Sequence, residues 1–112
     1  MVKESFGEYL RNLREDEDIP IRKVAAALDI DQSTLSKFER GERLPKEEII
    51  PKIAKYFEVD FEEMRLSYFG DKVVKQILFD QNAERILETA KEKLEYIKSK
   101  NYNQGKLNFN GI

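Results

Sequence analysis

The chain of 112 residues contains no cysteine, no histidine and no tryptophan. It therefore lacks the usual zinc ligands, thiol nucleophiles and disulfide bonds, as well as the side chain that most often transfers protons near neutral pH. The sequence also contains no glycine-rich phosphate loop and no nucleophile motif. We expect a protein that is not an enzyme, with no catalytic residues, no metal site and no cofactor.

Long apolar runs are also missing, because runs such as the one from Val24 to Leu28 are far too short to cross a bilayer. Met1 is followed by no basic and apolar leader. These features predict a cytoplasmic protein with no membrane partner. The formal net charge of −2 gives no overall sign of nucleic-acid binding, so positive charge for DNA would have to be local.

Apolar residues recur three and four positions apart along most of the chain, and no stretch alternates long enough to indicate a half-buried strand. The sequence therefore predicts an all-α fold. Ser5 and Glu8 have the spacing of a capping box, Asp60 and Glu63 repeat it, and Asp31 is expected to cap a third helix. Helices are expected at about 5–14, 20–28, 31–40, 50–57, 60–69 and 83–100.

We expect three regions: a compact unit at 1–70, a helical extension at 71–100 and a flexible tail at 101–112. Gly70 is expected to close the compact unit, since it follows the last apolar cluster of that unit. The tail contains four Asn and two Gly among its twelve residues, a composition typical of disordered chain ends.

Residues 20–41 predict a helix-turn-helix, that is, two short helices joined by a tight turn. Gln32 and Ser33, at the start of the second helix, are short enough to approach base edges and can donate and accept hydrogen bonds. Lys37 lies one turn further along and is able to reach a guanine edge or a phosphate. An ordinary solvated helix face is the alternative interpretation of these three residues.

This pattern resembles the Xre-type helix-turn-helix regulators, which include the lambdoid phage repressors and Cro proteins. The resemblance runs from about Phe6 to Phe69 and is strongest over Val24–Leu28 and Ile30–Gly41. It implies a five-helix, lambda-repressor-like DNA-binding domain. It further implies that a homodimer binds a double-stranded DNA operator, with the third helix, about Gln32–Arg40, in the major groove.

Carried onto this chain, the resemblance implies specific contacts. Base contacts are expected from the third helix, at Gln32, Ser33, Thr34, Ser36 and Lys37. Phosphate contacts are expected from Arg40, Arg43 and Lys46, although plain surface charge is an alternative for the two arginines. A structural ion pair is expected between Arg14 and Glu39. The chain departs from the family at Ile21, where a phosphate-binding Gln is common, and at Asp29, where the turn favours Gly.

The charge is distributed unevenly along the chain. Residues 1–69 hold 12 Lys+Arg and 16 Asp+Glu, a formal −4, whereas residues 70–112 hold 8 and 6, a formal +2. Between residues 32 and 46, four basic side chains are opposed by only Glu39 and Glu42. Because phosphate attraction fades within a Debye length of about 8–10 Å, a local basic patch can outweigh acid on a distant face.

The apolar residues of segment 73–97 predict a dimer-forming helix pair. They are Val73, Val74, Ile77, Leu87, Ala90, Leu94 and Ile97. Two heptads fall short of a coiled coil, so a helix folded back on its own domain, with Ile86 added to the stripe, is the alternative.

Our hypothesis is a homodimeric transcriptional repressor or controller. The alternative is a different class of protein, a protein-interaction module such as an antitoxin, whose C-terminal helices bind another protein.

Overall fold

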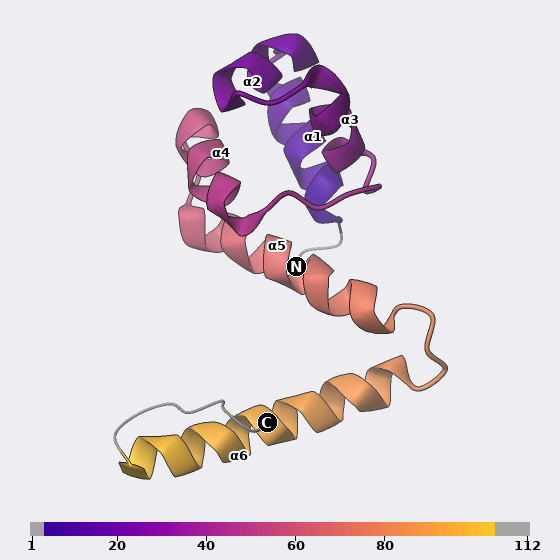
Figure 1. The fold of residues 1–112 in the computed structure, drawn as a ribbon, viewed down its shortest axis with the longest axis vertical. Helices are drawn as coiled ribbons and strands as arrows, with labels where there is room; N and C mark the ends of the chain where they lie inside the picture. Colours follow the sequence, from indigo (N-terminus) through magenta and orange to yellow (C-terminus); the bar gives the residue numbers. More distant parts are fainter. Residues whose placement is uncertain (1–3, 105–112) are drawn as a thin grey trace. The chain divides into compact units, whose positions relative to one another are not determined.

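A computed structural model describes residues 4–104, and every regular element in that range is helical, as predicted. The chain divides into two units, one up to Gln76 and one from Ile77, which are described separately. In the first unit the short helices cluster around a common centre (Figure 1). No helix within residues 4–104 combines the length and apolarity needed to span a membrane.

Within residues 4–104, the first unit contains five α-helices and one turn of 3-10 helix, and the second unit contains one long helix. In chain order the elements are α1 (Phe6–Asp16), α2 (Ile21–Leu28), α3 (Gln32–Glu39), η1 (Glu47–Ile49), α4 (Ile50–Phe57), α5 (Phe61–Ile77) and α6 (Ala83–Gln104).

Side-chain caps start two of these helices as predicted. The Glu8 N–H donates to Ser5 Oγ at 3.1 Å and the Ser5 N–H donates to Glu8 Oε1 at 2.9 Å, which completes the capping box of α1. At α5 the Glu63 N–H donates to Asp60 Oδ2 at 3.2 Å, which is one of the two hydrogen bonds of the expected capping box. These local contacts explain why both helices begin where the sequence indicates.

The predicted cap of α3 is confirmed in position but not in its side-chain hydrogen bond. Asp31 occupies the N-cap position in an extended backbone conformation, but its side chain accepts no capping hydrogen bond. Its main-chain carbonyl accepts from the Leu35 N–H at 3.1 Å instead. Because this helix end is exposed, water can solvate the first-turn N–H groups without help from the carboxylate.

Two helices of the first unit end on residues with a left-handed backbone. Asp29 has φ 58° after α2 and Glu58 has φ 54° after α4. The turn after α2 therefore forms with Asp in place of Gly, as expected, at a conformational cost of about 1 kcal/mol. The Lys52 ammonium donates to the Leu28 carbonyl at 3.4 Å, which satisfies one of the free acceptors at the end of α2.

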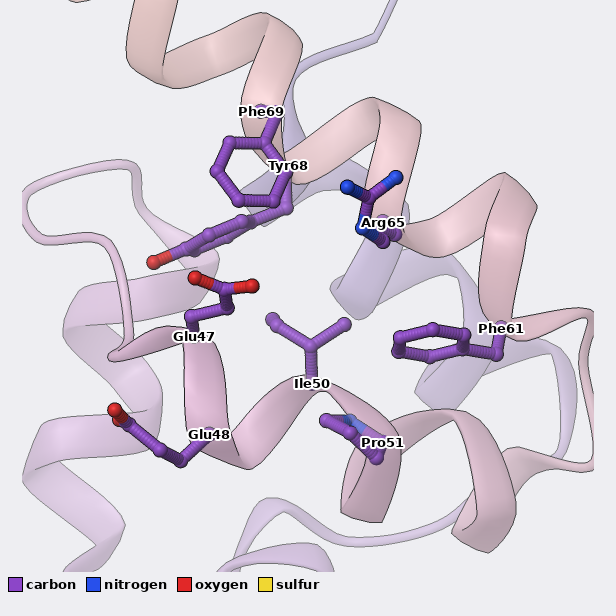
Figure 2. A pocket seen from close by; sticks show the side chains of 8 residues that line it. All are labelled: Glu47, Glu48, Ile50, Pro51, Phe61, Arg65, Tyr68 and Phe69. Atoms are coloured by element: carbon purple, nitrogen blue, oxygen red, sulfur yellow. The ribbon is translucent and has the colours of Figure 1, made fainter. Parts of the chain in front are cut away.

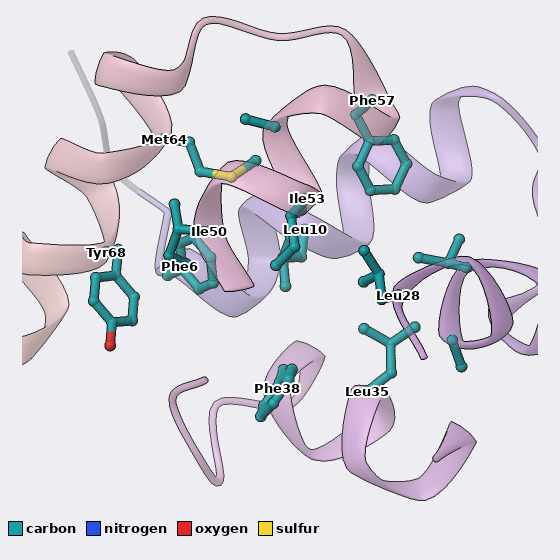
Figure 3. Packing of buried hydrophobic residues seen from close by; sticks show 13 residues of the cluster. Phe6, Leu10, Leu28, Leu35, Phe38, Ile50, Ile53, Phe57, Met64 and Tyr68 are labelled. Carbon is teal, nitrogen blue, oxygen red and sulfur yellow. The ribbon is translucent and has the colours of Figure 1, made fainter. Parts of the chain in front are cut away.

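The core of the first unit draws on all five of its α-helices (Figure 3). Phe6, Ile53 and Met64 are fully buried, and the Tyr68 ring stands edge-on to Phe6 with centroids 5.6 Å apart. The other buried apolar residues are Leu10, Val24, Ala25, Leu28, Leu35, Phe38, Ile50, Ala54 and Phe57. This closed core gives α3 a fixed support.

Helix α5 does not end at Gly70, contrary to the sequence prediction, but continues to Ile77. Asp71 Oδ2 accepts the Phe6 N–H at 3.0 Å, so the residue after Gly70 ties α5 to the start of α1. This long-range contact has no local sequence signal. Helix α6 likewise includes residues 101–104 of the expected tail, and the rest of that tail, 105–112, lies outside the described residues.

Helices α1 and α3 approach closely at Gly7. A Cβ atom at this position would lie 2.3 Å from the Phe38 carbonyl oxygen and 2.8 Å from the Glu39 carbonyl oxygen. Both neighbours are backbone atoms, which cannot move aside as a flexible side chain can. Only glycine fits between the start of α1 and the end of α3.

We expect Gly7→Ala to lower the free energy of unfolding by about 1–3 kcal/mol, because the added methyl group overlaps the backbone of α3. Gly70→Ala is the matched control, since it is also helical and a Cβ there meets nothing within 4 Å. It should raise stability by about 0.5–1 kcal/mol. Urea unfolding followed by circular dichroism measures both, and equal effects would contradict the close approach.

Candidate nucleic-acid interface

Helix α3 has a buried side and a solvent side. Leu35 and Phe38 are 1% and 4% exposed and point into the core, where α3 packs against α1 and α2. Successive residues of an α-helix are about 100° apart, which places Ser33, Lys37 and Arg40 on the opposite side. These three are exposed, as is Gln32 at the helix start, whereas Ser36 is half-buried.

Thr34 lies between the buried side of α3 and Lys37, which is about one turn further along the helix. Thr34 is half-buried and lines a shallow hollow of about 390 Å³ that also involves Ala26 of α2 and Arg43. The Arg43 guanidinium lies 6.0 Å from the centroid of the Phe38 ring. The structure therefore places Thr34 and Arg43 at the same hollow.

Arg40 makes two contacts within its own segment. Its Nε donates to Glu42 Oε2 at 2.5 Å, and its Nη1 donates to Ser36 Oγ. The hydrogen bond to Glu42 raises the pKa of the Arg40 guanidinium, and the same bond, aided by the charges of Arg40 and Lys37, lowers the pKa of the Glu42 carboxyl. Sequence reasoning counted Glu42 only as an opposing charge.

The turn after α3 brings Glu42 back toward the helix. Gly41 has φ +75°, a backbone conformation that favours glycine. The Glu42 N–H donates to the Lys37 carbonyl at 3.0 Å, and the Gly41 N–H donates to the Phe38 carbonyl at 3.1 Å. This is the usual glycine-based helix end, and Gly41 is the sequence signal that could have predicted the position of Glu42.

The loop between α3 and η1 is anchored from α5. The Tyr68 hydroxyl donates to the Pro45 carbonyl at 2.7 Å, and both residues are buried. Arg43 and Lys46, the expected phosphate contacts of this loop, remain exposed on either side of that anchor. Leu44 packs partly against the core. The two cations are therefore presented by a loop with fixed attachment points.

A second hollow, of about 350 Å³, lies beside this anchor (Figure 2). Phe61 is 43% exposed and forms part of the wall of this hollow. The full lining is Glu47, Glu48, Ile50, Pro51, Phe61, Arg65, Tyr68 and Phe69. Within the described part of the chain, no group of three or more acidic side chains is arranged to hold a metal ion.

Arg14 and Glu39 form a two-point ion pair between α1 and α3. Arg14 Nε lies 2.7 Å from Glu39 Oε2, and Arg14 Nη2 donates to Oε1 at 2.9 Å. Arg14 Nη1 also donates to the Ile19 carbonyl at 3.0 Å, and the hydrogen bond to Glu39 raises the pKa of the guanidinium. Arg11 approaches the same carboxylate at 3.7 Å. Glu39 is 5% exposed, so its negative charge is buried in the first unit and is compensated there by Arg14.

Ile21 explains one departure from the family pattern. It stands at the first position of α2 and packs partly against the core, where an apolar side chain gains more than a polar one. The position therefore serves packing in this chain. The DNA contact expected there from the family is replaced by a hydrophobic one.

None of the residues expected to form a dimer belongs to the buried core. Val73 and Val74 of α5 are 49% and 45% exposed, and Leu87 and Leu94 of α6 are 42% and 46% exposed. Ala90 is exposed, whereas Ile77 and Ile97 are partly covered. Phe79, in the turn between α5 and α6, is 96% exposed.

The arrangement of α2 and α3 is that of a helix-turn-helix, and comparison with known proteins agrees. Residues 10–64 match a protein family described as helix-turn-helix. The matched segment begins in α1, contains α2, α3 and α4, and ends in α5. This part of the chain is therefore similar to the helix-turn-helix family, in agreement with the predicted fold.

Two relatives are named as repressors. The HTH-type transcriptional repressor RghR of Bacillus subtilis (strain 168) is 35% identical over 60 residues, which cover 53% of this chain and 44% of that protein. The cryptic phage CTXphi transcriptional repressor RstR of Vibrio cholerae is 30% identical over 59 residues, 53% of each chain. The matches thus span about half the length of these curated relatives.

We expect Arg14→Met to lower the free energy of unfolding by about 3 kcal/mol, because it leaves the buried Glu39 carboxylate without its closest partner. Arg65→Met is the matched control; it breaks an exposed pair with Glu62 and should cost less than about 1 kcal/mol. Adding Glu39→Leu to Arg14→Met should restore most of the loss. Urea unfolding measures all three, and equal losses in the two arginine variants would contradict the role of the pair.

Proposed function

We propose that this chain binds double-stranded DNA in a sequence-specific manner, with α3 in the major groove. The main support is the solvent side of α3, where Gln32, Ser33 and Lys37 are exposed. The opposite side of this helix is packed into the core. A major groove admits one α-helix, and such side chains hydrogen-bond to base edges. Under this proposal Gln32, Ser33 and Lys37 contact bases, with Ser36 in support.

The local charge supports this proposal despite the acidic total. Lys37, Arg43 and Lys46 are exposed, whereas the nearest buried acid, Glu39, is already paired with Arg14. The first-turn N–H groups of α3 also have no side-chain cap, so they can attract a phosphate oxygen. Under this proposal Arg43, Lys46 and Arg40 contact phosphate. Thr34, which lines the same hollow as Arg43, is proposed to contact a base.

We further propose that two copies bind together as a homodimer through segment 73–97. The exposed apolar residues of α5, and separately those of α6, supply surfaces that a second copy can cover. Two domains held in this way can present their α3 helices to successive major grooves, about 34 Å apart on one side of a pseudo-palindrome. Occlusion of a promoter is then the simplest mode of action, in line with the repressor names of the two relatives.

Selection of bound duplexes from a random pool, at controlled salt, tests DNA binding directly. We expect enrichment of a site with two half-sites one helical turn apart, and a binding constant that falls steeply with salt. Because the same experiment reports sequence preference and symmetry, it separates a lone domain from a dimer. No enrichment of any sequence by the folded protein would contradict the proposal.

On the selected site, Lys37→Ala and Gln32→Ala should each weaken binding by roughly tenfold, since a side chain that reads a base edge is lost. Lys55→Ala removes the same charge from an exposed position of α4 and should change affinity by less than about twofold. Fluorescence anisotropy titrations of the folded variants measure these differences. Binding as tight as the parent's in both α3 variants would rule out the assigned interface.

Leu94→Lys should convert the dimer to a monomer, because it places a charge within the apolar stripe of α6. Glu92→Lys introduces the same side chain on the opposite side of α6 and should leave the dimer intact. Light scattering at several protein concentrations gives the molar mass. A parent chain that is already monomeric would contradict the dimer and favour a different partner protein for these apolar residues.

A further inference from the structure

The Arg40 guanidinium is occupied before any DNA arrives. Glu42 accepts from its Nε, and Ser36 accepts from its Nη1, so only Nη2 has no partner within residues 4–104. The two charged side chains are 46% and 53% exposed, which means that a ligand in solvent can reach them. This pair stands at the end of the exposed side of α3.

A carboxylate and a phosphate compete for the same donors of an arginine. An arginine binds either anion by donating two parallel hydrogen bonds, for example from Nε and Nη2. Arg14 binds Glu39 in this way in the structure. Arg40 cannot offer its Nε and Nη2 together to a phosphate while Glu42 holds Nε. The negative charge of the Glu42 carboxylate also repels a phosphate that approaches Arg40.

We propose that Glu42 restrains sequence-independent DNA binding by occupying Arg40 in place of a phosphate. This inference rests on the proposed function, because it assigns to Glu42 a role that weakens the proposed DNA binding. A phosphate contact from Arg40 requires that the guanidinium first release the Glu42 carboxylate, and the parent protein makes this exchange only in part. Since phosphate contacts carry no direct sequence information, the restraint acts equally on operator and unrelated duplexes.

Removal of the Glu42 charge should therefore strengthen binding to any duplex. We expect Glu42→Gln to raise affinity for a mixed-sequence duplex by roughly twofold to fivefold, as the loss of a competing exposed ion pair predicts. The slope of log affinity against log salt should become steeper by up to about 0.9, the value for one added phosphate contact. Ser36 still holds Arg40 in this variant, so the guanidinium stays in place.

Glu62→Gln is the matched control. Glu62 pairs with Arg65 on α5 at 2.8 Å, with side-chain exposures of 56% and 43%, close to those of the Glu42–Arg40 pair. The control changes the net charge by the same amount and breaks an equivalent ion pair elsewhere. We expect it to leave both the affinity and the salt slope nearly unchanged.

The experiment is a set of salt titrations with parent, Glu42→Gln, Glu62→Gln, Arg40→Ala and the Arg40→Ala/Glu42→Gln double variant. If the proposal holds, the gain from Glu42→Gln largely disappears when Arg40 is absent. A gain that persists without Arg40, an equal gain in Glu62→Gln, or no gain at all would overturn it while leaving DNA binding intact. Failure of every folded variant to bind any duplex at low salt would instead overturn the proposed function, and this inference with it.

Discussion

The Glu39 carboxylate, buried between α1 and α3, is the constraint on which the candidate site depends. A buried carboxylate is tolerated only when its hydrogen bonds and charge are satisfied, so α3 must keep the position in which Arg14 reaches it. Gly7 allows the same two helices to approach until their backbones nearly touch. Together these features fix the rotation of α3 about its own axis, and with it the direction that Ser33 and Lys37 face.

Local chemistry made most of the fold predictable. The capping box at Ser5 and the three- and four-residue spacing of apolar side chains determine where the helices begin and which sides they bury. The local sequence does not predict how far α5 extends, because Asp71 bonds to the Phe6 N–H, 65 residues earlier in the chain. A contact over that separation leaves no trace in a local pattern, so the sequence alone predicts a boundary at Gly70.

The candidate site was predictable to a similar extent. The exposed side of α3 follows from helical spacing alone, since Leu35 and Phe38 define the opposite side. The contacts of individual side chains were less accessible, because the position of Glu42 beside Arg40 depends on the backbone of the intervening turn. Counting charges along the chain therefore overstates the free positive charge, because Arg11, Arg14 and Arg40 already have carboxylate partners close to α3.

The hydrogen bond from Tyr68 to the Pro45 carbonyl has a consequence for the loop that carries Arg43 and Lys46. A loop held at one carbonyl by a buried side chain of a long helix samples few conformations in the free protein. Most of the conformational entropy of this segment is therefore lost when the chain folds. The loop meets a phosphate backbone already ordered, so little of the interaction energy is consumed in arranging it.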